Sequence, residues 1–290
     1  MPAPSTSASP VVSRVENRPV SGRRRAVSSP AGLPLSIDWV MTDRSGNALD
    51  LTTVANGTVK YKAIDAVPIG GEAWTEFAGT IATAAAGVVT LPIDPTLLTC
   101  PAVLTVDVAV VSDAAAMVAA NRFILYVDRS GWAATADDMG PPSVDEIRLH
   151  MRDSGPEDNM WLDAEEFDLA EVANAVEKCV RHWNEALPPI NQKYRTATWP
   201  WRMNMLDGVT SYLYRMAARH YRRVHLPYQA GGLTVDDKNK SAEYEQIAAA
   251  LWQQYASWVE DQKVVLNVQG AYGVLGSVYG ARAWHGWSGG

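Results

Sequence analysis

Histidines and clustered carboxylates are the side chains of this sequence that could carry acid–base or metal chemistry. His220 and His225 are five residues apart, a spacing that points their rings to different sides of a helix, and no HExxH motif occurs. The carboxylates gather at 157–158, 163–166 and 236–237, where they suit loops and first helical turns as caps. The sequence also lacks a nucleophile elbow, a Walker loop and a dinucleotide fingerprint. We therefore expect no enzyme, with no catalytic residue, no metal ligand and no cofactor-binding residue.

The two cysteines, Cys100 and Cys179, are far apart and form no CxxC pair. This spacing indicates neither a disulfide framework nor a zinc cluster, and it suits a protein made in a reducing cytoplasm. Cys179 falls on the apolar stripe of an expected helix, so we interpret it as a small core residue rather than a nucleophile.

The net charge of −7 is unevenly distributed, because residues 1–34 carry +4 and the remainder carries −11. An acidic body argues against a dedicated nucleic-acid-binding protein. One basic face interrupts it, formed at helical spacing by Arg215, Arg219, Arg222 and Arg223. Two interpretations stay open: an electrostatic contact with an acidic neighbour or with passing DNA, and a solvated face paired with local carboxylates.

The first half of the chain has the pattern of a β domain. Residues 1–34 are rich in Ser, Pro, Ala and Arg without a sustained period, so we expect a flexible basic arm. Over 35–130, short apolar runs alternate with turn signals. Together they predict an immunoglobulin-like antiparallel β-sandwich. The expected strands are 35–39, 58–64, 74–81, 87–93, 103–111 and 122–128.

The second half has helical periodicity and follows an expected linker at 131–142. Ser143 and Glu146 form an S-x-x-E capping box for a short helix through about Arg152. Further apolar stripes predict helices over about 167–183, 200–224 and 237–263. We therefore expect an α-helical bundle over 143–267 and an α+β multidomain protein.

Residues 268–290 have no clear period. They combine seven glycines with four large aromatic residues: Tyr272, Tyr279, Trp284 and Trp287. Glycines allow close backbone approach, and aromatic residues bury large areas on binding. We therefore expect an extended tail that docks in a groove between neighbouring subunits. No run approaches the about 20 consecutive apolar residues of a membrane span, and no signal-peptide pattern occurs at the N-terminus.

Two stretches of sequence carry resemblances to phage proteins. WVMTDRSGNALDLT, a later G-x-V-T-L return and the closing FILYV resemble the N-terminal module of phage baseplate upper proteins. That module is a small β-sandwich that fixes a protein into the virion. The likeness covers about residues 35–130.

The helical half resembles the head-to-tail connector (adaptor) proteins of tailed phages over about 141–290. The residues that carry this likeness are PPSVDEIRLHMRD, an acidic loop, FDLAEVANAVEKCVRHWNE, two further helices and the Gly/aromatic tail. The resemblance implies a ring of twelve copies beneath the portal protein, with the tail residues docked on the portal.

The two resemblances together imply a structural protein of the virion neck, made in the host cytoplasm and in contact with downstream neck or tail proteins. Two alternatives remain. One is a baseplate or tail-fibre anchoring protein, and the other is a glycan-binding virion module.

Overall fold

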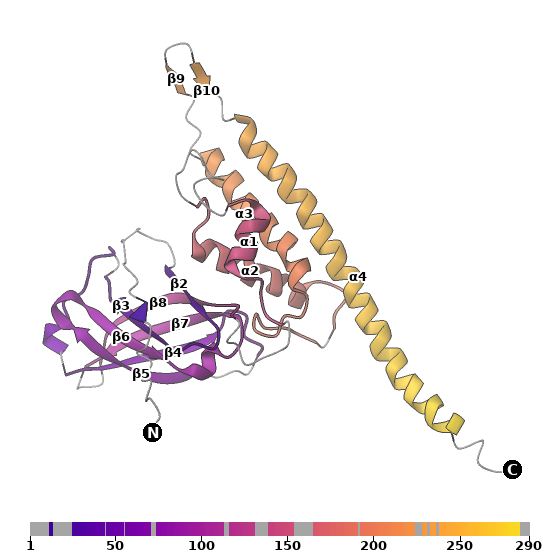
Figure 1. Ribbon diagram of the computed structural model, residues 1–290, viewed down its shortest axis with the longest axis horizontal. Coiled ribbons are helices and arrows are strands. Elements are labelled where there is room, and N and C mark those ends of the chain that lie inside the picture. The colour runs from indigo at the N-terminus through magenta and orange to yellow at the C-terminus, as the bar shows by residue number, and fades with distance from the viewer. Residues whose placement is uncertain are drawn as a thin grey trace, which may run out of the picture.

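The computed structural model describes residues 12–13, 25–43, 45–54, 56–70, 74–112, 116–130, 139–153, 165–190, 192–223, 228–230, 233–235 and 238–284. Strands occupy the N-terminal half and four helices dominate the C-terminal half (Figure 1). The expected α+β class is confirmed at this level.

The strands of the first half form one curled sheet of eight strands, in the order β1-β3-β6-β5-β4-β7-β8-β2. β5 pairs with β4 through Gly79 and with β6 from Thr80 onward, so it joins the two halves of the sheet. Trp39 of β3 stacks on Phe123 of β8 with ring centroids 4.4 Å apart, which closes the sheet over a single core. The strands are β1 (Val12–Ser13), β2 (Arg25–Pro30), β3 (Leu35–Val40), β4 (Thr58–Asp65), β5 (Thr75–Thr83), β6 (Val88–Ile93), β7 (Ala102–Val111) and β8 (Met117–Asp128).

Alternating side chains explain the strands that the sequence predicted. In β3, Leu35, Ile37 and Trp39 are buried, whereas the residues between them are partly exposed. β4 shows the same alternation, with Val59 and Tyr61 inside. A period of two places one apolar face on the core, so the local pattern suffices to define these strands.

The prediction of a flexible arm over residues 1–34 is wrong for residues 25–34. Arg25–Pro30 forms β2, which pairs in parallel with β8 at one edge of the sheet. Val27 and Ala31 are buried in the sheet core, and Ser29 is 2 % exposed. The short segment lacks a clear hydrophobic period of its own, and its partner strand lies almost 100 residues later, so only tertiary pairing defines it. Of residues 1–24, only β1 belongs to the described residues.

The helices confirm the predicted order. α1 (Val144–Met151) and α2 (Leu169–Glu185) each begin with a complete capping box, at Ser143–Glu146 and Asp168–Glu171. α3 (Arg202–Arg223) is followed by a short hairpin of β9 (Tyr228–Ala230) and β10 (Leu233–Val235). α4 (Lys238–Trp284) runs along α3 and then continues beyond it (Figure 1).

The sheet and the helices pack directly against each other. Ala66, which directly follows β4, and Val103 and Tyr126 of β7 and β8 belong to the same apolar cluster as Val176 and Trp183 of α2. Residues 131–138 of the expected linker lie outside the described residues. The last residue of the linker, Pro142, is held by the sheet, because the Tyr126 hydroxyl donates a 2.6 Å hydrogen bond to its carbonyl. The domain boundary stays a prediction, but the described parts on either side share a core.

Gly208 of α3 allows three helices to approach closely. A Cβ atom at this position would lie 2.8 Å from Cys179 Sγ of α2 and 3.0 Å from the Tyr255 ring of α4. We expect Gly208→Ala to lower the free energy of unfolding by about 1–3 kcal/mol, because overpacking exceeds the gain in helix propensity. Gly270→Ala is the matched control, since a Cβ atom there meets nothing within 4 Å. Urea unfolding measures both, and equal stability of the two variants would contradict the close packing.

Candidate docking interface

The C-terminal part of α4 leaves the rest of the protein (Figure 1). Earlier in the helix, Ala248, Tyr255 and Val259 are almost fully buried. After Lys263 the burial pattern changes: three valines are 44–50 % exposed, namely Val264, Val265 and Val268. From 264 to 281 the sequence contains no Asp, Glu, Lys or Arg. We call residues 264–284 the projecting segment.

Lys263 fixes α4 at the point where the projecting segment begins. Its side chain is almost fully buried, and Nζ donates a hydrogen bond to the carbonyl of Ala186, the C-cap residue of α2. Nζ also lies 5.5 Å from the centroid of the Trp183 ring. A cation at a helix C-terminus interacts favourably with the helix dipole. Lys263 therefore sets where α4 departs from α2.

Lys263 should make stability depend on pH in the alkaline range. Burial lowers the pKa of Lys263 from its ordinary value of 10.5. The folded protein then releases this proton more readily than the unfolded chain, so the free energy of unfolding rises with pH between the lowered pKa and 10.5. We expect Lys263→Met to remove this rise in a pH series of urea titrations. Lys178→Met, at an exposed position, is the control and should keep it. Identical profiles for both variants would show that Lys263 is not the source.

The expected extended conformation of the tail is wrong for the described residues. Tyr272, Tyr279 and Trp284 lie in α4, which is helical to Trp284, and Trp287 lies outside the described residues. Once a helix is nucleated, each added residue costs little, and the packed part of α4 supplies the nucleus. Four glycines, each about 1 kcal/mol less favourable than alanine, weaken this continuation but do not end it.

The predicted basic face lies on α3, and two of its four arginines contact α4. The Arg215 guanidinium lies 5.3 Å from the centroid of the Trp252 ring, and Arg222 Nη2 lies 2.9 Å from Glu245 Oε2. Arg219 and Arg223 are exposed. Local pairing therefore accounts for one half of the face, and the other half presents cations to solvent.

The described residues contain no group of three or more His, Cys, Asp or Glu side chains that could hold a metal ion. Cys179 is fully buried, and burial raises the pKa of its thiol well above the usual range, which fits a core residue. Among the helices that the structure describes, none is long and apolar enough to cross a membrane.

Sequence reasoning missed the exposed valines and Lys263. The sequence does mark where the projecting segment begins, because an uncharged run directly follows the highly charged segment Glu260–Lys263. Comparison with protein-family models and with curated proteins finds no match for this chain. Function is therefore inferred from the geometry of the chain itself and from the resemblances noted above.

Proposed function

We propose that this chain is a structural virion protein of a tailed bacteriophage, the adaptor of the neck that docks on the portal protein and joins capsid to tail. The observation that carries the proposal is the projecting segment. It presents three exposed valines on a helix that has no charged residue from 264 to 281, beyond the packed body. Exposed contiguous apolar surface marks an interaction site. A helix of this kind suits a groove between portal subunits.

The proposal includes the finer description of both halves. The sheet is an immunoglobulin-like sandwich whose two ends close over one core, and the helices are a bundle in which α3 is central. Stacking of Trp39 on Phe123 supports the closed sandwich. Packing of Gly208 against α2 and α4 supports the helical bundle. In this role the sandwich contacts a neighbouring neck or tail protein, while the bundle carries the projecting segment.

The position of the protein within the particle tests the proposal. Antibodies raised against the isolated protein should label purified virions between capsid and tail. Label at the distal end of the tail would contradict the adaptor role and favour the baseplate or fibre-anchoring alternative. A glycan array with the purified protein tests the third possibility, for which we expect no binding above that of an unrelated control protein.

A further inference from the structure

The last turn of α2 packs against α4 directly before the projecting segment begins. α3 contacts the earlier part of α4, where the Ser211 hydroxyl donates a 2.7 Å hydrogen bond to the Ala248 carbonyl. Closer to the projecting segment, side chains of α2 also contact α4. These contacts are His182–Trp252, His182–Tyr255, Trp183–Trp258 and Ala186–Lys263. We call residues 252–263 the root of the projecting segment.

His182 is the side chain in this contact that can change its charge near neutral pH. Its half-buried ring lies 4.6 Å from the Trp252 ring and 6.0 Å from the Tyr255 ring, measured between centroids. Among the described residues, none hydrogen-bonds to either ring nitrogen. A neutral imidazole suits these aromatic neighbours, whereas an imidazolium would lose hydration there without gaining a fixed acceptor.

Cations from two other helices already lie at this contact. The Arg215 guanidinium of α3 is 5.3 Å from the centroid of the Trp252 ring, and Nζ of the buried Lys263 of α4 is 5.5 Å from that of Trp183. A protonated His182 would add a third positive charge, which these two cations repel. The other titratable groups around the contact are Glu185 of α2, Tyr212 of α3, and Tyr255 and Glu260 of α4.

Protonation of His182 is therefore unfavourable in the folded chain. Burial and the charge of Lys263 lower the pKa of His182 from its ordinary value of 6.5, although Glu185 and Glu260 oppose the shift. The unfolded chain then binds the proton more tightly than the folded chain. This contribution to stability is complete above pH 6.5 and is lost as the pH falls through the lowered pKa.

We propose that the packing of His182 on α4 is an acid-sensitive contact, and that its protonation loosens the root of the projecting segment from α2. Most of the stability of a helix in a protein comes from tertiary packing, so a loosened root should also open more often. The acid-sensitive contact is a property of the isolated chain. Weaker docking on the portal in acid is its consequence, and that consequence rests on the proposed function.

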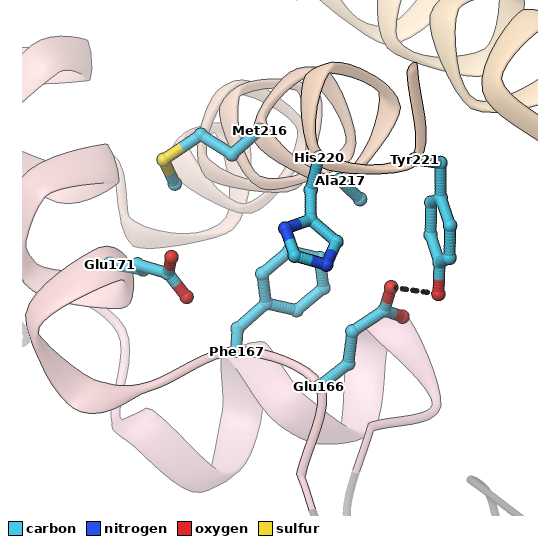
Figure 2. A pocket seen from close by; sticks show the side chains of 7 residues that line it. All are labelled: Glu166, Phe167, Glu171, Met216, Ala217, His220 and Tyr221. Atoms are coloured by element: carbon cyan, nitrogen blue, oxygen red, sulfur yellow. Dashed lines mark hydrogen bonds between the residues drawn. The ribbon is translucent and has the colours of Figure 1, made fainter. Parts of the chain in front are cut away.

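His220 provides the matched control. Figure 2 shows its ring in a pocket of about 190 Å³ between the loop that precedes α2 and the C-terminal half of α3, with Glu171 on one side and Glu166 on the other. A protonated ring there lies near carboxylates rather than cations. This end of α3 packs near the start of α4, where the Ser241 hydroxyl donates a hydrogen bond to the Ala218 carbonyl. Protonation of His220 should therefore leave the root unchanged.

Hydrogen exchange measured by mass spectrometry at about pH 7.5 and about pH 5 tests the inference, after correction for the intrinsic pH dependence of exchange. In the wild-type protein, protection of the amides of 252–267 should fall at least about twofold more in acid than that of 241–251. His182→Phe keeps an aromatic ring that cannot titrate and should abolish this difference, whereas His220→Gln should retain it. The same loss of protection in His182→Phe, or none in the wild type, would overturn the inference.

A proton NMR titration of the His182 ring gives an independent readout, with its signals assigned as those lost in His182→Phe. We expect a pKa below 6.5 in the wild type and a pKa closer to 6.5 in Lys263→Met, which lacks the neighbouring cation. A wild-type pKa at or above 6.5 would overturn the acid-sensitive contact. Portal binding that is equally strong at both pH values, although the root opens in acid, would overturn only the consequence for docking.

Discussion

Asp65→Ala is expected to lower the free energy of unfolding by about 3–5 kcal/mol, the largest effect of any single substitution proposed for this chain. Asp65 ends β4 and is only 8 % exposed. Its carboxylate accepts hydrogen bonds from the amides of Val67, Thr196 and Ala197 at 2.8–3.1 Å, and from the Thr196 hydroxyl at 2.7 Å. Alanine would leave these buried donors at the sheet–helix junction without their acceptor.

Asp65 should also contribute a characteristic pH dependence. Burial raises the pKa of its carboxyl above the ordinary value of 3.8, although four hydrogen bonds oppose the shift. The folded state then binds the proton more tightly than the unfolded chain. This contribution to stability is complete below about pH 3.8 and is lost as the pH rises through the raised pKa. Asp65→Asn cannot titrate and should lack that decline.

Asp50→Ala is the control for both measurements. Asp50 is exposed, and its carboxylate accepts a 2.9 Å bond from the Thr52 amide only two residues away. We expect a much smaller loss of stability there than at Asp65. If Asp65→Ala proved no more destabilising than Asp50→Ala in urea titrations, the junction would not depend on Asp65.

Deleting residues 268–290 is expected to abolish binding to the portal and to leave the body folded. The deletion keeps Lys263 and also Leu266, which is partly buried against the helical core. The removed part begins at Val268, which is 46 % exposed. The melting temperature should therefore change by less than about 4 °C. Trp284→Ala/Trp287→Ala should reproduce much of the loss of binding, since buried tryptophans at protein interfaces are each worth about 2 kcal/mol or more.

Trp74→Ala is the matched control for the tryptophan variant, because Trp74 is a 36 % exposed tryptophan in the β half. It should bind the portal as the wild type does. A truncated chain that unfolds would place the projecting segment in the core of the protein, and a truncated chain that still binds the portal would exclude it as the anchor.

Local signals explain how much of the fold the sequence could predict. The capping pairs Ser143–Glu146 and Asp168–Glu171 lie three residues apart, and the predicted pair Ser143–Glu146 forms as expected. The alternation in β3 is equally local. β2 is different, since it is defined by pairing with β8 at the other end of the domain. A weak pattern can belong to a strand when a distant partner supplies the hydrogen bonds.

Side-chain contacts at the sheet–helix junction and within the helical half also join residues that are distant in the sequence. Asp65 and Thr196 are 131 residues apart, and Glu166 and Tyr221 are 55 residues apart. Neither pair leaves a motif in the sequence. The prediction of an extended tail at the end of α4 was wrong for another reason. The glycines there favoured an extended chain, whereas the helix is propagated from residues already packed against α3.

Native mass spectrometry of the protein, alone and mixed with the purified portal protein, tests docking on the portal. We expect a portal complex carrying several copies of the wild-type chain, and none with the chain truncated after Asn267. We also expect that Trp284→Ala/Trp287→Ala binds far more weakly than Trp74→Ala. Unchanged masses of both components after mixing at micromolar concentration, or equal binding of the wild-type and truncated chains, would contradict docking on the portal through the projecting segment.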